Sequence, residues 1–191
     1  MRGLAPGTAI LAEDETDLLL FPLLRAGWAK EGEPAAVRLS GWNARRVVFG
    51  AIELRTGERV LQVQERQRSA DFQPLLVAAR ERYGARPIAL LLDEDPSHTA
   101  GASATLAQEL DIQLLWLPKR APELNPMDSL WRHAKDLICA NRQYQTIEEQ
   151  ALRFVHYLKS LPNPAALRMA GVQSLDFWLK SALSKDFWGH A

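Results

Sequence analysis

Three aspartates at the ends of expected secondary-structure elements are the residues best suited to chemistry in this chain of 191 residues. Asp14 follows a short apolar segment, Asp93 follows the apolar run Ile88–Leu92, and Asp128 lies early in an expected helix. Carboxylates are the hard oxygen ligands that Mg²⁺ and Mn²⁺ prefer. Two such ions can activate an attacking oxygen and stabilise a leaving one, so the aspartates, if they converge, indicate phosphoryl transfer without a protein nucleophile.

The first acid is ambiguous from the sequence alone, because four acidic residues lie within five positions. Glu13, Asp14, Glu15 and Asp17 all compete for the role. Alternation along a strand sends Asp14 and Glu15 to opposite faces, but it does not say which face holds the site. Four neighbouring carboxylates repel one another unless a cation or basic side chains offset their charge.

The other two acids each have a purely structural explanation. Asp93 opens the sequence Asp-Glu-Asp-Pro-Ser, which is ordinary turn chemistry. Asn125 is a suitable N-cap and Pro126 a suitable first helical residue, which puts Asp128 at the third position, where a carboxylate interacts favourably with the helix dipole. The case for a site therefore depends on the convergence of all three acids.

The apolar pattern predicts antiparallel strands first, then alternating strands and helices, then helices. The expected strands are Thr8–Ala12, Arg45–Leu54, Arg59–Gln64, Ile88–Leu92 and Ile112–Leu117. The expected helices are Ser69–Tyr83, Ala102–Leu110, Asn125–Ala140 and Thr146–Leu161, followed by a helical tail over residues 162–191. This is the element order of the RNase H-like fold, an α/β fold in which a mixed sheet is flanked by helices.

Several local details follow from the same pattern. Ser69 is the expected N-cap of its helix and Gly84 its C-terminal stop. The segment Leu18–Leu24 either extends the first strand or turns helical. A strand-helix-strand unit links Ile88–Leu92 to Ile112–Leu117, so these two strands must be parallel neighbours, and we expect both to be buried.

The composition bounds the class of protein. With 47% apolar residues the chain can form one well-buried domain over residues 1–191. Lys plus Arg and Asp plus Glu both number 23, which counts against a stand-alone DNA-binding module but not against a nuclease. The single cysteine, Cys139, fits a reducing cytosol, and no run of about 18 apolar residues indicates a membrane span. We expect a soluble, cytoplasmic protein without membrane partners.

A family resemblance enters through the segment Leu117–Trp131, followed by Lys135. In this segment Pro-Glu-Leu-Asn-Pro is followed by a hydrophobic residue, Met127, then by the acid Asp128, two further residues and Trp131. It closely resembles the third-acid motif of Tc/mariner superfamily transposases, especially the insertion sequence 630 group. Leu92–His98 resembles the second-acid motif of that family, and Asp14-Glu15 followed by Gly27-Trp28-Ala29 resembles the first.

The resemblance implies an RNase H-like catalytic domain in which Asp14, Asp93 and Asp128 hold metal ions, two of Mg²⁺ or Mn²⁺. It implies that metal-activated water cuts DNA at the end of a mobile element, and that the freed 3′-hydroxyl attacks target DNA, commonly at the dinucleotide TA. It also implies a homodimer in a bacterial cytoplasm, associated with the nucleoid. Relatives carry N-terminal helix-turn-helix domains, which these residues lack, so we expect DNA recognition to come from elsewhere. The chain is then either a separately encoded or truncated catalytic half, which a separately encoded helix-turn-helix subunit could complete, or an isolated remnant.

A second group of residues are candidates for DNA contacts. They are His98, Lys119, Arg120, Arg132 and Lys135. Each has a structural alternative: Arg132 can pair with Asp128 across one helical turn, for about 0.3–0.5 kcal/mol. A structural hydrogen bond explains His98 equally well. Trp131 can stack on a base, but we favour core packing for it.

Two other functions remain open at this stage. Glu94 follows the second acid where the family usually has Asn, which motivates a catalytically impaired remnant that acts as a DNA-associated or oligomerising module. The chain can also be a different RNase H-like nuclease, acting on RNA–DNA hybrids or branched DNA. The Pro-Glu-Leu-Asn-Pro segment argues against this last possibility.

Overall fold

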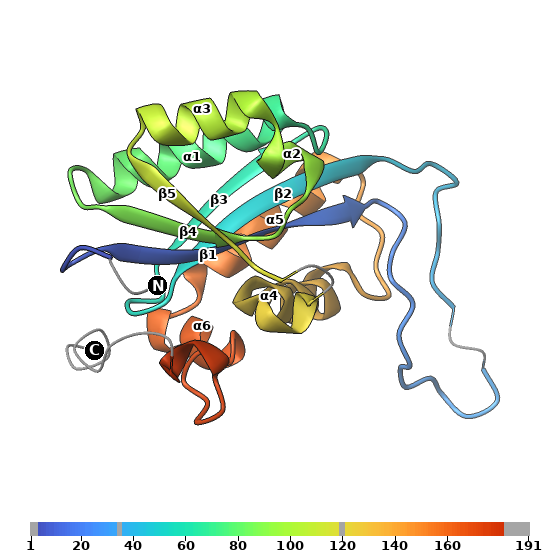
Figure 1. Cartoon of the computed structure of the whole chain (residues 1–191). Coiled ribbons are helices and arrows are strands. Elements are labelled where there is room, and N and C mark those ends of the chain that lie inside the picture. Colours follow the sequence, from blue (N-terminus) through green and yellow to red (C-terminus); the bar gives the residue numbers. More distant parts are fainter. Residues whose placement is uncertain (1–3, 34–35, 119–120, 182–191) are drawn as a thin grey trace.

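The computed structural model of the chain describes residues 4–33, 36–118 and 121–181. Its centre is a five-stranded mixed sheet with the strand order β3-β2-β1-β4-β5 (Figure 1). The strands are β1 (Ala9–Leu19), β2 (Arg45–Glu53), β3 (Arg59–Gln64), β4 (Ile88–Leu92) and β5 (Ile112–Trp116). β2 runs antiparallel to its neighbours β1 and β3, whereas β4 runs parallel to both β1 and β5.

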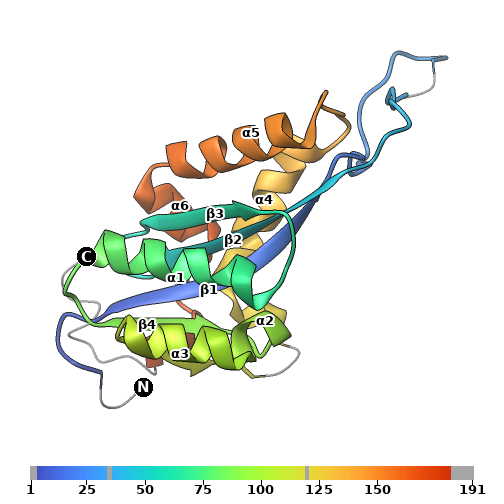
Figure 2. The same cartoon turned by 90° about the horizontal axis from the view of Figure 1, so that it is seen from above.

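Helices cover both faces of the sheet (Figures 1 and 2). One face is covered by α1 (Ser69–Tyr83), α2 (Pro96–Thr99) and α3 (Gly101–Glu109). The other face is covered by α4 (Pro126–Ala134), which continues as the π-helix η2 (Lys135–Cys139), and by α5 (Ile147–Ser160) and α6 (Asn163–Met169). Two short 3₁₀ segments complete the described elements, η1 (Pro122–Leu124) and η3 (Trp178–Ser181). The α/β, RNase H-like prediction is confirmed.

Alternation along β1 divides its side chains between two hydrophobic cores. Ile10, Ala12 and Leu18 pack with residues of α4, α5 and α6. Ala9 and Leu11 pack with residues of α1 and α3 on the opposite face. The same alternation separates the neighbouring acids of β1, and this decides which of them can meet the other two aspartates.

Two strand predictions need correction. The first strand does not end at Ala12 but continues through the acidic residues to Leu19, because β2 pairs with it along this whole stretch. Leu18–Leu24 therefore does not turn helical. The strand β5 is an edge strand instead of a fully buried one, and Trp116 is 43% exposed. Apolar side chains at an edge strand are covered only on the side that faces a helix.

The helix predictions hold in position but differ at their ends. Gly84 terminates α1 with a positive φ of 56°, as expected. Ser69 is not the N-cap: Arg68 holds that position, and the Ser69 hydroxyl hydrogen-bonds to that of Ser103 at 2.8 Å. The helix expected from Asn125 to Ala140 changes from α- to π-helical geometry at Lys135. Of the expected helical tail, residues 182–191 lie outside the described part of the chain.

The segment between β1 and β2 extends far from the body of the domain (Figure 2). It carries the Gly27-Trp28-Ala29 motif, and Trp28 is fully exposed. Its base is fastened by the side chain of Asn141, which accepts from the Arg25 backbone N–H at 2.9 Å and donates to the Arg25 carbonyl at 3.0 Å. Among the described residues, no helix is both long and apolar enough to cross a membrane.

Candidate metal centre

The three predicted aspartates lie at the same end of the sheet. The parallel register of β1 and β4 ends at the pair Ala12 and Leu91, so Asp14 and Asp93 each lie two residues beyond it. Asp128 lies in the first turn of α4, which packs against β1. Burial raises the pKa of Asp14 to about 8, and the negative charges of Glu15, Asp93 and Asp128 add to this rise. The topology therefore brings Asp93 and Asp128 within electrostatic range of Asp14.

The fold also separates Asp14 from its acidic neighbours. Asp14 shares a strand face with Ala12, whose side chain packs in the core formed with α4. Glu13 and Glu15 point to the opposite face, where both approach His98. Of these acids, Asp14 is the one on the same side of the sheet as α4, so the structure favours it as the partner of Asp128.

The helix that carries Asp128 is fastened directly to the strand that carries Asp14. The side chain of Asn125 accepts a hydrogen bond from the Met127 backbone N–H at 3.1 Å, so Asn125 is the N-cap of α4, as expected. Its Nδ2 atom donates to the backbone carbonyl of Glu13 at 2.7 Å. One buried amide thus caps α4 and fixes its first turn beside β1, which holds the backbones of the two acids in register.

Trp131 and Gly50 lie next to Asp14 and to each other. Trp131 is buried and stacks on Phe154 with ring centroids 6.0 Å apart, which confirms core packing. Gly50 is the β2 residue that pairs with Asp14, and a Cβ placed there would lie 2.5 Å from Cη2 of Trp131. The indole N–H lies close enough to the Asp14 carboxylate to lower its pKa, against the larger effect of burial.

The importance of Gly50 was not anticipated from the sequence. A signal for it exists, because a lone glycine inside the apolar strand sequence Val-Val-Phe-Gly-Ala-Ile marks a place where another group approaches the backbone closely. The identity of that group, the ring of Trp131, comes from packing between elements far apart in the chain.

A second polar cluster lies behind the three aspartates, on the α1 face of the sheet. His98 Nδ1 is 3.0 Å from Asp93 Oδ1, and His98 Nε2 is 3.3 Å from Glu13 Oε2 and 3.4 Å from Glu15 Oε2. The His98 and Glu13 side chains are almost completely buried. Burial would lower the pKa of His98, but Glu13, Asp93 and Glu15 together raise it to about 11. Burial raises the pKa of Glu13 well above its ordinary value.

This cluster corrects the prediction that His98 contacts DNA. Its ring is buried against Phe72, with centroids 4.6 Å apart, and a hydrogen bond from it lowers the pKa of Asp93. The structural hydrogen bond considered as the alternative is the one observed. The sequence did not single out Glu13 for this role, although a glutamate that strand alternation directs into an apolar core was the available signal.

The other candidate DNA contacts have different surroundings. Lys119 and Arg120 lie outside the described residues. Arg132 pairs with Asp128 at 2.6 Å, and the two side chains are 68% and 41% exposed, so this is the surface ion pair considered as the alternative. Lys135 is half-buried: burial lowers its pKa, while the negative charges of Asp17, Asp14 and Asp128 oppose this. The Lys135 side chain therefore lies within electrostatic range of Asp14 and Asp128.

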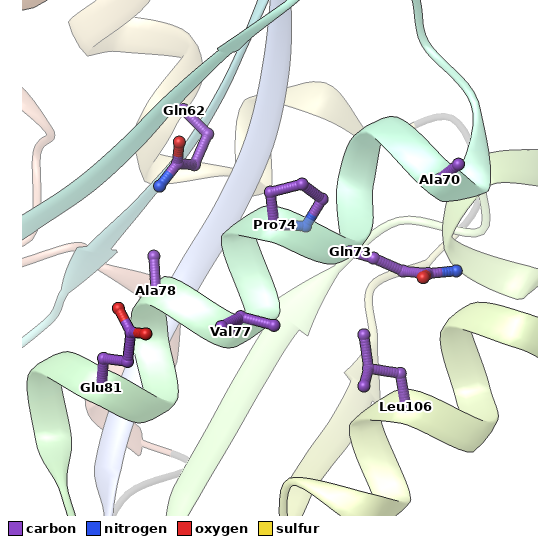
Figure 3. Close-up of a pocket in the computed structure, with 8 residues that line it drawn as sticks. All are labelled: Gln62, Ala70, Gln73, Pro74, Val77, Ala78, Glu81 and Leu106. Carbon is purple, nitrogen blue, oxygen red and sulfur yellow. The ribbon is translucent and has the colours of Figure 1, made fainter.

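The groove shown in Figure 3 lies elsewhere. It has a volume of about 450 Å³ and runs between β3, α1 and α3. Its lining is Gln62, Ala70, Gln73, Pro74, Val77, Ala78, Glu81 and Leu106. None of the predicted site residues borders it, and its one acidic side chain, Glu81, has no second carboxylate in the lining to form a metal site.

Comparison with known proteins decides the family. Residues 9–150 match the sequence profile of the family described as DDE superfamily endonuclease. The chain belongs to this family. Over 154 residues it is 25% identical to the insertion element IS630 uncharacterized 39 kDa protein of Shigella sonnei, a match that covers 80% of this chain and 45% of that protein. The Tc/mariner and insertion sequence 630 resemblance read from the motifs is thereby confirmed, and the chain spans less than half the length of this relative.

Solved structures of a mariner transposase share the fold. The Mos1 transposase paired-end complex with left transposon end superimposes with a TM-score of 0.70 at 17% identity, covering 93% of this chain and 55% of that one. The catalytic domain of Mos1 mariner transposase gives a TM-score of 0.56 at 15% identity, covering 85% of this chain and 76% of that one. This DDE endonuclease therefore has the architecture of a transposase catalytic domain.

The residues at the acidic end of the sheet suit divalent cations. Asp14, Asp93 and Asp128 supply only oxygen ligands, which Mg²⁺ and Mn²⁺ prefer. Asp93 and Asp128 are each paired with a basic side chain, whereas Asp14, the most buried of the three, forms no ion pair with a basic residue in the described chain. Because burial and the neighbouring acids raise the pKa of Asp14 to about 8, we expect Asp14 to carry a proton near neutral pH without metal, and a bound cation would take the place of that proton.

This exchange predicts a pH dependence of metal binding. Because the pKa of Asp14 is about 8 without metal, a cation that binds below this pH must displace a proton. The Mn²⁺ affinity is expected to rise by up to about tenfold per pH unit towards pH 8 and then to level off. Calorimetric titrations in buffers of different ionisation enthalpy would measure this and would show about one proton released. An affinity that is flat from pH 6 to pH 8 would contradict a protonated Asp14.

Proposed function

We propose that this domain is a metal-dependent DNA nuclease and strand transferase whose ligands are Asp14, Asp93 and Asp128, holding two Mg²⁺ or Mn²⁺ ions. The observation that supports this most strongly is the arrangement of the three acids: Asp14 and Asp93 each lie two residues beyond the end of the β1–β4 pairing, and Asp128 lies in the first turn of α4. The raised pKa of Asp14 agrees with this arrangement. Three elements far apart in the chain carry these carboxylates to the same end of the sheet, and membership of the endonuclease family supports a nuclease chemistry for them.

The ions would supply activation of the attacking oxygen and stabilisation of the leaving oxygen during in-line phosphoryl transfer. The protein's own residues prepare the site. Asp14 would be a rigidly held ligand because it lies in the middle of β1, where its backbone pairs with Gly50 of β2. The Asn125 cap holds the first turn of α4 against β1 and so fixes the backbone of Asp128. Lys135 places a positive charge beside the carboxylates, where a DNA phosphate would approach.

The proposed substrate is DNA at the end of a mobile element, followed by target DNA, with TA as the proposed insertion site. Two solved structures with this fold are named as a transposase paired-end complex with left transposon end and as a strand transfer complex. By analogy we propose that two copies of this chain act together, and that a helix-turn-helix module outside these residues recognises the element's ends.

Cleavage and joining are tested with purified protein and supercoiled plasmid DNA. We expect nicking that requires Mn²⁺ or Mg²⁺ and stops when a chelator is added, and joining of a 3′-hydroxyl oligonucleotide to the plasmid. Sequencing of the joints gives the target preference. Cleavage of RNA–DNA hybrid in preference to duplex DNA would identify a different RNase H-like nuclease. Absence of bound ion at millimolar Mn²⁺ would identify the catalytically impaired remnant.

A further inference from the structure

The buried ring of His98 lies between Asp93 and two acids of β1, Glu13 and Glu15, which point to the face of the sheet opposite to Asp14. On one side its Nδ1 atom is 3.0 Å from Oδ1 and 3.2 Å from the backbone carbonyl of Asp93. On the other side its Nε2 atom faces Oε2 of Glu13 and Oε2 of Glu15. Stacking on Phe72 fixes the plane of the ring. The imidazole therefore has a single orientation, set from three directions.

The geometry determines which ring nitrogen donates to Asp93. A carboxylate oxygen and a carbonyl oxygen both accept hydrogen bonds, so Nδ1, which faces one of each, must carry a proton. The Nε2 side faces carboxylate oxygens. The oxygens of Glu13 that face it have no hydrogen-bond partner among the described residues. The second oxygen of Glu15 is held by the amide of Gln67, which also bonds to Asp95.

The Asp93 carboxylate needs such support more than Asp14 does. Its side chain is 54% exposed and lies on the loop after β4, so nothing in a strand fixes its rotamer. Its Oδ1 atom accepts from both His98 Nδ1 and the backbone N–H of Asp95, each at 3.0 Å. With Oδ1 occupied twice, Oδ2 is the oxygen left to bind a cation.

We propose that His98 is a positioning residue that orients the Asp93 carboxylate for metal binding, and that the buried Glu13 and the partly buried Glu15 hold the ring in place. The proposal rests on the proposed metal site and assigns a role in it to two acids that are not ligands. Replacing a group that holds a ligating residue by a hydrogen bond commonly lowers metal affinity about 10- to 100-fold, and we expect an effect of this size here.

Two substitutions separate the two sides of the ring. In the His98→Asn variant, the amide nitrogen of the new side chain can lie near the position of Nδ1 and donate a hydrogen bond to Asp93. In the His98→Gln variant, the amide nitrogen of the longer side chain can reach the position of Nε2 near Glu13, which leaves Asp93 without its hydrogen-bond donor. We expect Mn²⁺ affinity, measured by calorimetry without DNA, to fall about 10- to 100-fold in His98→Gln and only a few-fold in His98→Asn. His156→Gln, on the exposed surface of α5, is the matched control.

A purely structural role predicts a different result, in which both variants lose thermal stability but bind Mn²⁺ like the wild type. That result would overturn the proposal. For variants that do not fold, wild-type protein labelled with ¹⁵N-histidine gives an independent measurement. We expect a slowly exchanging Nδ1 proton resonance, shifted by its hydrogen bond to a carboxylate and moved by Asp93→Ala. Absence of this resonance would also overturn the proposal, whereas failure of the wild type to bind Mn²⁺ with the resonance present would count against the metal site alone.

Discussion

Replacement of Asp14 by asparagine is expected to reduce metal-dependent DNA cleavage by about 1000-fold or more, with little loss of folding stability. The change keeps the shape of the side chain and removes the negative charge that a cation requires. In the metal-free protein it also removes repulsion from Asp93 and Asp128, because the raised pKa shows that the charged form of Asp14 is unfavourable there. Stability should therefore be unchanged or slightly higher while cleavage is lost.

The matched control for this prediction is Asp17→Asn on the same strand. Asp17 pairs with Arg45 at the surface, and the side chains of both are 46% exposed. We expect this variant to cleave plasmid DNA like the wild type. Full activity in Asp14→Asn would exclude Asp14 as a ligand. If Glu15→Gln then lost both Mn²⁺ binding and cleavage, the first ligand would belong to the opposite face of β1.

The choice of Asp14 shows where sequence reasoning reaches its limit. Strand alternation separates Asp14 from Glu13 and Glu15 but does not identify the face that receives the third acid. That depends on where α4 packs, and α4 is placed by a hydrogen bond between Asn125 and the Glu13 carbonyl, residues more than 100 positions apart. The third-acid motif identified the family and the residue Asp128, whereas the arrangement of the acids required the fold.

Most element positions could be predicted because each carries a local signal. The hairpin of β2 and β3 has two apolar runs joined by a turn, and α1 ends at a glycine with positive φ. The errors occur where tertiary contacts override such signals. Pairing with β2 keeps β1 extended through four acids, and the hydroxyl of Ser69 bonds to Ser103 instead of capping its own helix. No local pattern reports these contacts.

The environment of His98 could not be foreseen for a related reason. Glutamate in a strand is ordinarily solvated, so Glu13 was read only as one member of an acidic group. In the fold it is buried against an imidazole contributed by the segment after β4. Burial of a carboxylate is tolerable when a donor or cation faces it, and the sequence does not show that His98 reaches across to provide one.

The second large effect is expected from Gly50→Ala, which should lower the free energy of unfolding by about 1–3 kcal/mol, as overpacking of a core does. The new methyl group would lie 2.5 Å from Cη2 of Trp131 and 2.7 Å from Cδ2 of Leu61. Leu61 can shift its flexible end, but the Trp131 ring is held by stacking on Phe154. Because Gly50 pairs with Asp14, the displaced ring should also weaken Mn²⁺ binding.

A double-mutant cycle tests whether Trp131 causes this effect. Trp131→Phe removes the outer ring atoms that the methyl group would meet, so Gly50→Ala should cost less in the Trp131→Phe background than in the wild type. For residues in contact the expected coupling is about 0.5–3 kcal/mol, measured by urea unfolding. Gly101→Ala is the control, since no atom outside its own helix lies within 4 Å of the added carbon. Additive energies for Gly50 and Trp131 would show that the indole can move aside freely, and a ring that moves aside freely would not hold Asp14 rigid.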